Sequence, residues 1–522
     1  MRRRRYLLLV LVVALGAAAL PLWAQQPAGA GDAVQYSLAD CLRIALQNNL
    51  DLVIARKDPE IAAQQIEVQD GRFDGVFGAS ANYNDQTNSS TITDNVGGAS
   101  TDGDLNATNW DASGSWSQLL NFGGTYSVTL NAIGNDRTSR SINQFTGLLT
   151  DASLNADEQG LALHYEMPLL ANFGKEATTL ELLLARSGLD VSKQDLRLQA
   201  MQSMKSVEDA YWDLMAVRAA LQVARESLKL AQDLLDLNKK KVEVGTLAPI
   251  EITQAEAGVA SREEGVIVAE AGVKNAEDNL RRLLAIPKDD PAWSREILPT
   301  DRPQFEKQPA DEAAALTAAM ENRPEMAMAR QQLKDTELSE RVAKNQTRHS
   351  LTLSADLAPG QSTDKYRQTN FPPTIPPTDT TTDADGRTWA VGLLYGYPLG
   401  NRQAKANYAI ATLNREKSDL ALQNTEQSIR VDVRTAVRSV ESGGKRVDAA
   451  HSNTILQRKT LEAEQKKFDN GMSTSFEVLR IQTDLSNAQL SEIRAILDYN
   501  KALADLERAK GTLLEARGLK LE

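Results

Sequence analysis

KFDNGMSTSFEVLRIQT, residues 467–483, decides the fold because a related stretch, KVEVGTLAPIEIT, occurs at residues 241–253. A constant shift of 226 residues superposes Gly245 on Gly471 and Glu251 on Glu477. Each stretch follows one long helical pattern and precedes another, so each predicts a tight turn between antiparallel helices, with glycine just past a helix end. Two such tips in one chain predict an internal repeat.

Heptad patterns predict long helices on both sides of each tip. The first pair is expected over 177–241 and 250–284, and the second over 404–469 and 475–511. Small residues at alternate seam positions favour close packing of neighbouring helices. Gly443 occupies such a position in the second long helix, where it also allows a mild kink. The first seam comprises Val207, Leu214, Leu221, Leu228, Leu235 and Val242, with Ala210, Val217, Ala224, Ala231 and Asn238.

Between the helical segments the apolar pattern changes to a period of two, which predicts strands with one apolar face. Their length suits tilted strands in a membrane, but a soluble β-sandwich with buried aromatic residues explains the pattern equally well. The polar segments 85–109 and 359–387 are expected to be irregular connectors at a solvent-facing rim. Strands are expected at 77–83, at 113–132 as an extra hairpin turning at Gly123-Gly124, and at 161–169, 351–357 and 389–399.

The sequence divides into a leader, two repeats and a connector. Residues 1–24 carry Arg2 to Arg5 and then a short apolar run, which is typical of a secretory signal peptide. The first repeat is expected over 25–284, an irregular connector over 285–310 and the second repeat over 311–522. Residues 45–56 align with 319–330, so each repeat is expected to begin with a short helix, a break and a second helix.

Composition excludes several classes of function. The formal net charge is −12 without a basic stripe, which argues against binding to nucleic acid. The single cysteine, Cys41, excludes an intrachain disulfide and any multi-cysteine metal site. His164, His349 and His451 are isolated from one another, without ligand spacing or a nucleophile motif. We therefore expect no enzyme activity, metal site or cofactor.

Signal peptide, twofold repeat, strand pairs, long helices and glycine-containing tips together resemble the TolC-type outer membrane efflux proteins, or outer membrane factors. The resemblance covers nearly the whole mature chain and implies a mainly α fold with a membrane β-barrel, completed in a homotrimer by strands from each chain. It further implies an α-helical tunnel in the periplasm of a Gram-negative-type bacterium. Implied partners are outer membrane lipid, a periplasmic adaptor and an inner-membrane pump, in a tripartite efflux or type I secretion system.

Physical reasoning supports the trimer, because one chain supplies too few strands to close a barrel and an open edge in lipid is unfavourable. The family uses four strands per chain, whereas six candidates are present here, so four or six remain open. The competing interpretation is a coiled-coil surface or adhesive protein with a membrane β-anchor. Paired tips favour the export duct, because a stalk needs no hairpins that return to the membrane.

The resemblance also implies roles for tip residues. Glu477 matches an acidic position whose side chains form a ring around the closed periplasmic mouth. Glu251 is the equivalent residue of the first repeat, and it either joins this ring or faces a neighbouring helix. Arg480 stands in place of a second acid, and Phe468 in place of an aromatic residue with a hydroxyl group. We therefore expect either a weaker gate or one held by a Glu477–Arg480 pair. The alternative is an ordinary exposed helical pair. Expected adaptor contacts, or simple turn residues, are Gly245, Thr246, Leu247, Gly471, Met472 and Ser473.

Overall fold

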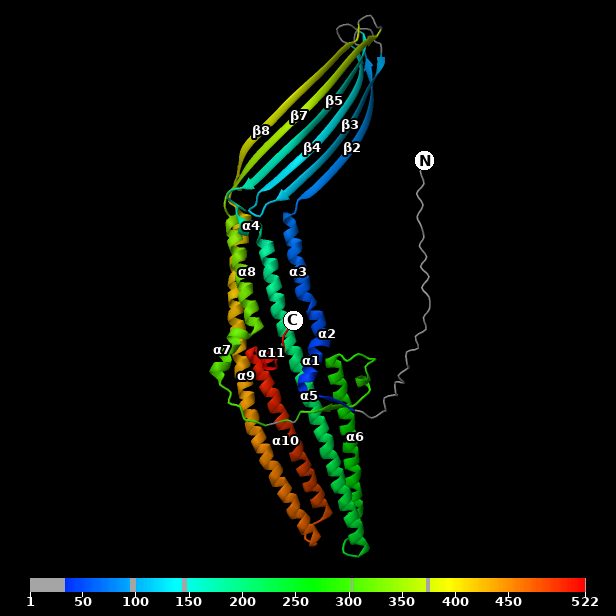
Figure 1. The fold of residues 1–522 in the computed structure, drawn as a ribbon, viewed down its shortest axis with the longest axis vertical. Helices are drawn as coiled ribbons and strands as arrows, with labels where there is room; N and C mark the ends of the chain where they lie inside the picture. The colour runs from blue at the N-terminus through cyan, green and yellow to red at the C-terminus, as the bar shows by residue number, and fades with distance from the viewer. Residues whose placement is uncertain are drawn as a thin grey trace, which may run out of the picture.

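The computed structural model describes residues 33–93, 100–142, 148–301, 303, 305–371 and 376–521. The leader predicted at residues 1–24 lies outside this part of the chain. The molecule is elongated, with an antiparallel sheet at one end and two helical hairpins at the other (Figure 1). Within the described residues, no helix combines the length and the apolar character needed to cross a bilayer.

The long helices have nearly the predicted limits. Helices α5 (Leu180–Glu243) and α6 (Ile250–Leu284) form the first hairpin, and α9 (Arg402–Asp469) and α10 (Ser475–Lys510) form the second. At 64 and 68 residues, α5 and α9 are each about 100 Å long at about 1.5 Å per residue. Helix α9 continues through Gly443, where an added Cβ would lie 3.4 Å from the Tyr499 ring. The glycine therefore permits close packing of α9 against α10.

The predicted seam of α5 is correct in its upper part and shifts in its lower part. Val207 and Leu214 are fully buried, as expected. Further along, Ser227 and Leu234 are the buried residues, whereas Leu228 and Leu235 are only partly buried. The two parts of α5 pack in different clusters, Val207 and Leu214 around Cys41, and Leu234 with Leu461 and Val478, so the buried face changes with the neighbouring elements.

Six strands form one antiparallel sheet in the order β2-β3-β4-β5-β7-β8. All six candidate strands are therefore present, and the extra hairpin of the first repeat is β3–β4, turning at residues 120–124. The first repeat runs from α3 (Lys57–Asp70) through β2, β3, β4 and β5 to α5, whereas the second runs from α8 (Pro324–Gln346) through β7 and β8 to α9. The strands are β2 (Val76–Thr93), β3 (Ser100–Leu119), β4 (Thr125–Ile142), β5 (Leu149–Pro168), β7 (Ser350–Phe371) and β8 (Thr378–Gly396).

The prediction of irregular connectors at 85–109 and 359–387 was wrong. These residues continue the strand ladder as far as the pairs Thr93↔Ser100 and Gln368↔Thr378. Their polarity was read as a sign of loops. However, a strand with mostly polar residues on both faces needs no apolar pattern, because its hydrogen bonds come from neighbouring strands.

Short helices and the connector surround the middle of the molecule. Helices α1 (Leu38–Asn48), α2 (Leu50–Ala55) and α3 (Lys57–Asp70) begin the first repeat, and α7 (Glu312–Asn322) and α8 (Pro324–Gln346) begin the second. The connector is not wholly irregular, because β6 (Ile297–Pro299) pairs in parallel with β1 (Val34–Tyr36). A core around Cys41, Tyr211 and Leu280 lies beneath this pair. The remaining short elements are η1 (Gly71–Phe73), α4 (Lys175–Thr178), η2 (Pro291–Trp293) and α11 (Leu513–Ala516).

Candidate functional site

The two tips have the same backbone structure. Gly245 and Gly471 follow the ends of α5 and α9 with φ of 76° and 74°, a conformation that favours glycine. At each tip the residue after the glycine donates its backbone N–H to a lysine carbonyl five positions earlier. These bonds are Thr246 to Lys241 at 2.9 Å and Met472 to Lys467 at 2.8 Å. The repeat thus extends to individual hydrogen bonds.

The predicted pair on α10 is present. The Arg480 guanidinium donates to the Glu477 carboxylate, with Nε–Oε2 and Nη2–Oε2 distances of 2.9 and 2.8 Å. Arg480 also reaches Asp484 at 3.4 Å. The hydrogen bond to Glu477 raises the pKa of Arg480. Both partners are accessible to solvent in the single chain.

Phe468 does not lie at this surface. Its ring is buried in a cluster with Leu461, Val478 and Leu485. The Lys241 ammonium lies 4.1 Å from the ring centroid and donates to the Phe468 carbonyl oxygen at 3.1 Å. Phe468 therefore links the two hairpins through its ring face and its backbone, although it lacks a hydroxyl group.

Glu251 faces the neighbouring hairpin, which is one of the two orientations expected for it. Its Oε2 accepts a hydrogen bond from the backbone N–H of Ser475, the first residue of α10, at 3.2 Å. Fully buried Asn238 donates to Ser475 Oγ at 2.7 Å and to the Glu251 carbonyl oxygen at 3.1 Å. Arg262 adds a further link by donating to the Leu479 carbonyl oxygen at 3.0 Å. Polar contacts thus join the hairpins close to both turns.

Sequence reasoning missed the contacts that Lys241, Asn238 and Arg262 make with the other hairpin. Of the three, only Asn238 could have been noticed in the sequence, because it is a polar residue at a seam position otherwise held by Ala or Val. The partners of Lys241 and Arg262 lie 227 and 217 positions away along the chain. No local pattern reveals such contacts.

The tip residues expected to contact an adaptor differ in exposure. Met472 is 71% exposed, and Gly245, Thr246 and Gly471 are also exposed. Leu247 packs partly against the cluster beneath the tips. Ser473 Oγ donates to Glu464 at 2.5 Å, and this hydrogen bond lowers the pKa of Glu464. Further exposed apolar side chains at the tips are Val244, Ile250 and Phe476.

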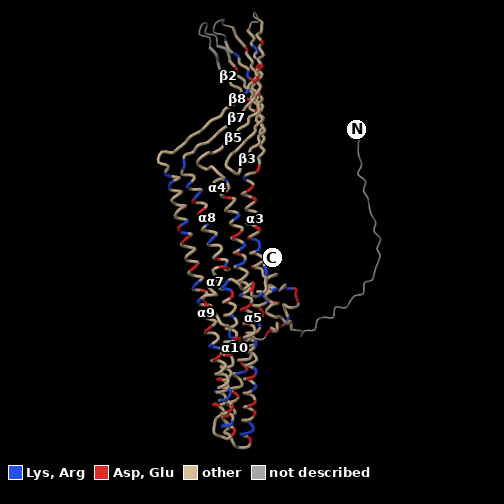
Figure 2. The backbone as a smooth tube through the Cα atoms, turned by 60° about the vertical axis from the view of Figure 1, so that its left-hand side comes forward, with Lys and Arg blue, Asp and Glu red and all other residues tan. Residues whose placement is uncertain are grey.

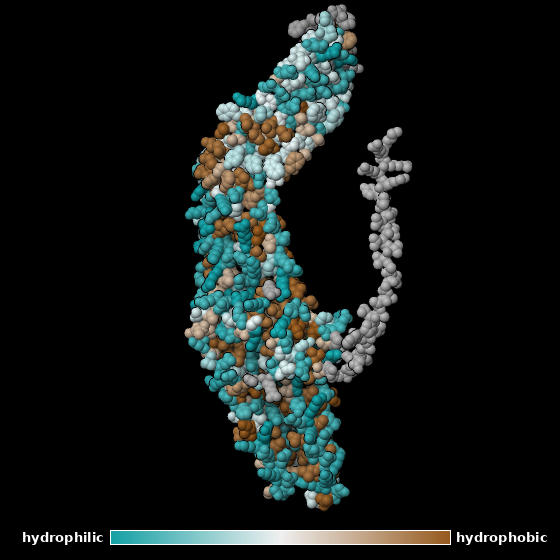
Figure 3. All heavy atoms as spheres, in the orientation of Figure 1, coloured by the Kyte–Doolittle hydropathy of each residue, from teal (hydrophilic) through white to brown (hydrophobic). Residues whose placement is uncertain are grey.

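The sheet has one apolar face next to the helices. Strand register aligns the residues of this face across all six strands, as in the row Phe77–Trp116–Val128–Leu163–Leu357–Trp389. Trp389 and Val391 are 73% and 65% exposed. The apolar side chains of this face occupy every second position, starting with the first, in segments 77–83, 110–116, 126–132, 161–167, 351–357 and 389–395, which are called the apolar segments below. Figure 3 shows brown apolar surface in this part of the sheet and paler, hydrophilic surface beyond it.

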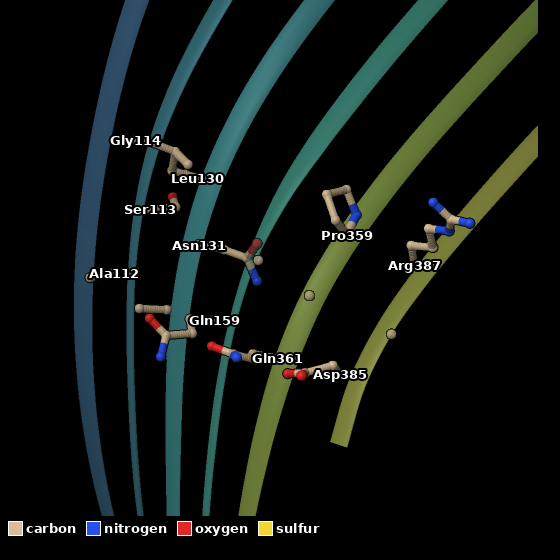
Figure 4. Close-up of a pocket in the computed structure, with 14 residues that line it drawn as sticks. Ala112, Ser113, Gly114, Leu130, Asn131, Gln159, Pro359, Gln361, Asp385 and Arg387 are labelled. Atoms are coloured by element: carbon tan, nitrogen blue, oxygen red, sulfur yellow. The ribbon is translucent and has the colours of Figure 1, made fainter. Parts of the chain in front are cut away.

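The opposite face of the same segments is polar. It carries Ser113, Ser127 and Thr129, and His164 with its Nδ1 2.6 Å from Asp356 Oδ1. A hollow of about 960 Å³ crosses the middle of the sheet where the apolar segments end (Figure 4). Among its lining residues are Gly114 and Ala132 of the apolar segments, and Gln361 and Arg387, which lie beyond those segments on the same face. The sheet thus separates an apolar surface from a polar one, as a wall between lipid and water requires.

Comparison with known proteins agrees with this geometry. The family model described as "Outer membrane efflux protein" matches residues 170–285 and 315–512. The pyoverdine export outer membrane protein OpmQ of Pseudomonas putida is 23% identical over 381 residues, which cover 72% of this chain and 74% of the relative. Nodulation protein T of Rhizobium leguminosarum bv. trifolii is 22% identical over 332 residues, covering 63% of this chain and 67% of the relative.

Solved structures of channels share the fold. The Campylobacter jejuni CmeC outer membrane channel superposes with a TM-score of 0.60 at 17% identity, covering 91% of this chain and 86% of that one. The outer-membrane channel OprN gives a TM-score of 0.62 at 14% identity, covering 91% and 90%. The chain belongs to the outer membrane efflux protein family and is an efflux channel subunit of the bacterial outer membrane.

Proposed function

We propose that three copies of this chain form a passive export duct, with the sheets closed into one barrel in the outer membrane and the helices continuing as a tunnel through the periplasm. The observation that carries the proposal is the pair of unpaired edges on the sheet, β2 and β8. An edge strand leaves backbone N–H and C=O groups without partners, which is unfavourable in lipid. Pairing β8 of one chain with β2 of the next removes every edge and gives eighteen strands.

Exposed apolar stripes on the helices support the same assembly. Ile54, Ile61 and Val68 recur every seven residues along α2 and α3, below the β2 edge, and are 67%, 54% and 68% exposed. Leu413 and Leu420 recur likewise on α9, below the β8 edge, and are 63% and 64% exposed. Helices α3 and α9 lie on opposite sides of the helical part of the chain (Figure 1). A ring of three chains would bring each α3 stripe against the α9 stripe of its neighbour and bury both.

The tips would close the periplasmic mouth of this duct. Glu477 and Arg480 supply charge there, and contacts around Lys241 and Asn238 hold the two hairpins of one chain together. The exposed apolar side chains at the tips offer the contact surface for a periplasmic adaptor that carries an inner-membrane pump. Such a duct takes no part in cargo chemistry, so the pump selects the exported compound or polypeptide.

Disulfide cross-linking tests the arrangement. In a Cys41→Ala background, Ile61→Cys combined with Leu413→Cys is expected to give covalent dimers and trimers on non-reducing gels of outer membranes. The matched control combines Ile61→Cys with Leu456→Cys, which lies exposed on the lower part of α9, and should remain monomeric. A properly inserted Ile61/Leu413 pair that never cross-links between chains would contradict the proposed ring.

A further inference from the structure

The strands are much longer than a membrane requires. They contain 18 to 22 residues, or roughly 60–70 Å at about 3.3 Å per residue. A tilted strand needs only about 9–11 residues to cross a bilayer. About half of each strand therefore lies beyond the thickness of the lipid.

The apolar face ends at a defined level on every strand. On β8 it ends at Trp389, and the next residues on that face are Arg387, Asp385 and Asp383. On β5 it ends at Leu161, followed by Gln159, Asp157 and Asn155. The distal face also carries the cross-strand ion pairs Arg140–Asp151 and Arg367–Asp379. Figure 2 shows the same division, with charged residues in the distal part of the strands.

The level of this change follows the geometry expected of tilted strands. Tyr83 pairs with Trp110, and both end the apolar segments of their strands. The end of the apolar segment moves two residues closer to the helices at each of three steps: from β3 to β4, from β4 to β5 and from β5 to β7. A plane that cuts across tilted strands must step through the register in this way. The steps all run in one direction, as expected for one plane across tilted strands, and Tyr83, Trp110 and Trp389 lie at the boundary on β2, β3 and β8.

We propose that only the helix-proximal halves of the strands contact lipid, and that the distal halves continue the duct into the aqueous exterior. The proposal rests on the proposed function for its orientation, with the helices in the periplasm. About ten further residues per strand, tilted by about 45°, place the outlet roughly 20 Å above the lipid. Cargo then leaves beyond the lipid headgroups, so an apolar compound is less readily taken back by the outer leaflet.

Cysteine labelling of intact cells tests the boundary. The chain has one cysteine, Cys41, so a Cys41→Ala background removes the native thiol and leaves only the introduced one to react. Asn155→Cys and Leu163→Cys both lie on the outer face of β5, on opposite sides of the boundary. A maleimide carrying a polyethylene glycol of about 5 kDa, too large for passage through porins, is expected to label Asn155→Cys in intact cells and Leu163→Cys only after denaturation.

A third variant distinguishes failure of the proposed external extension from failure of the proposed orientation of the duct. Met472→Cys at the exposed tip should be labelled only after the outer membrane is permeabilised. Labelling of Met472→Cys in intact cells would contradict the orientation and thus the proposed function. Protection of Asn155→Cys while Met472→Cys behaves as expected would overturn the external extension alone.

A shortened protein gives an independent test. The three distal hairpins can be cut at the register pairs Gln86↔Ala107, Asp136↔Asn155 and Ser362↔Ala384, and each rejoined with Asn-Gly. Because the apolar segments remain intact, the shortened protein is expected to reach the outer membrane at the level of the full chain. Failure to insert, with helices that remain folded and protease-resistant, would show that the distal halves lie in lipid and would refute the proposal.

Discussion

Lys241 of the first tip lies against Phe468 of the second, with its ammonium nitrogen 4.1 Å from the ring centroid and 3.1 Å from the carbonyl oxygen. Asp469 lies 3.8 Å from the same nitrogen. One partly buried cation therefore contacts a ring face, a helix-end carbonyl group and a carboxylate of the other hairpin. Any movement that parts the two hairpins must break all three contacts.

Lys241→Met is expected to loosen the tips. The change keeps the length of the side chain but removes the cation, and with it an interaction worth about 1–2 kcal/mol in partly desolvated surroundings. The population with parted tips should rise roughly 5- to 30-fold, seen as higher open probability in single-channel recordings. Lys240→Met, at the exposed neighbouring position, is the control. Equal open probability in the two variants would contradict the role of Lys241.

Asn238→Ala should destabilise the contact between the tips from within the core. The change removes the hydrogen bonds to Ser475 and to the Glu251 carbonyl group, and leaves a buried hydroxyl short of a partner. Such losses cost about 1–3 kcal/mol. Hydrogen exchange of the first turn of α10 should become about ten times faster or more, whereas Lys239→Ala at the exposed next position should leave it unchanged.

Much of the fold could be predicted because its determinants are local. Gly245 and Gly471 indicate the backbone conformation of their turns, and each heptad seam indicates the buried face of its helix. The strand ends could not be predicted, since Asn, Ser, Thr and Asp suit both loops and strands that are wetted on both faces. The tip contacts were also out of reach. Lys241–Phe468 depends on how two hairpins pack side by side, and only Asn238, a polar residue in an apolar seam, indicated a contact there.

Acid should weaken the attachment of α7 and α8 to α9. Arg323, buried at the start of α8, donates to Glu325 at 2.6 Å and to Asp432 at 3.1 Å. Burial is the largest single influence on Glu325 and acts to raise its pKa. The hydrogen bonds from Arg323 and from the backbone, together with the charges of Arg323 and Arg508, outweigh burial and lower that pKa below its ordinary value of 4.5. The ionised carboxylate therefore stabilises the fold above pH 4.5, and this contribution disappears as pH falls through the lowered pKa.

The measurement compares thermal unfolding of the wild type with that of Glu325→Gln. Above about pH 5.5 the variant should be less stable by about 1–3 kcal/mol, as expected for a hydrogen bond between charged groups. The difference should shrink steadily below pH 4.5. Glu312→Gln is the control, because Glu312 pairs with Arg434 at a solvent-exposed site and should change stability little. A difference that is independent of pH would contradict this account.

Arg480→Ala and Glu477→Ala should change ion selectivity in opposite directions. Removing Arg480 leaves the Glu477 carboxylate unneutralised, so three symmetry-related carboxylates would make the mouth more cation-selective. Removing Glu477 leaves Arg480 beside Asp484, which should reduce cation selectivity.

Mean conductance should change less, because an exposed pair contributes only about 0–1 kcal/mol. Reversal potentials across a KCl gradient in planar bilayers measure the effect, which should fade near 1 M salt, where the screening length is about 3 Å. Glu462→Ala, at an exposed position on α9, is the matched control. If neither tip variant shifts the reversal potential or the conductance, Glu477 and Arg480 do not line the gate.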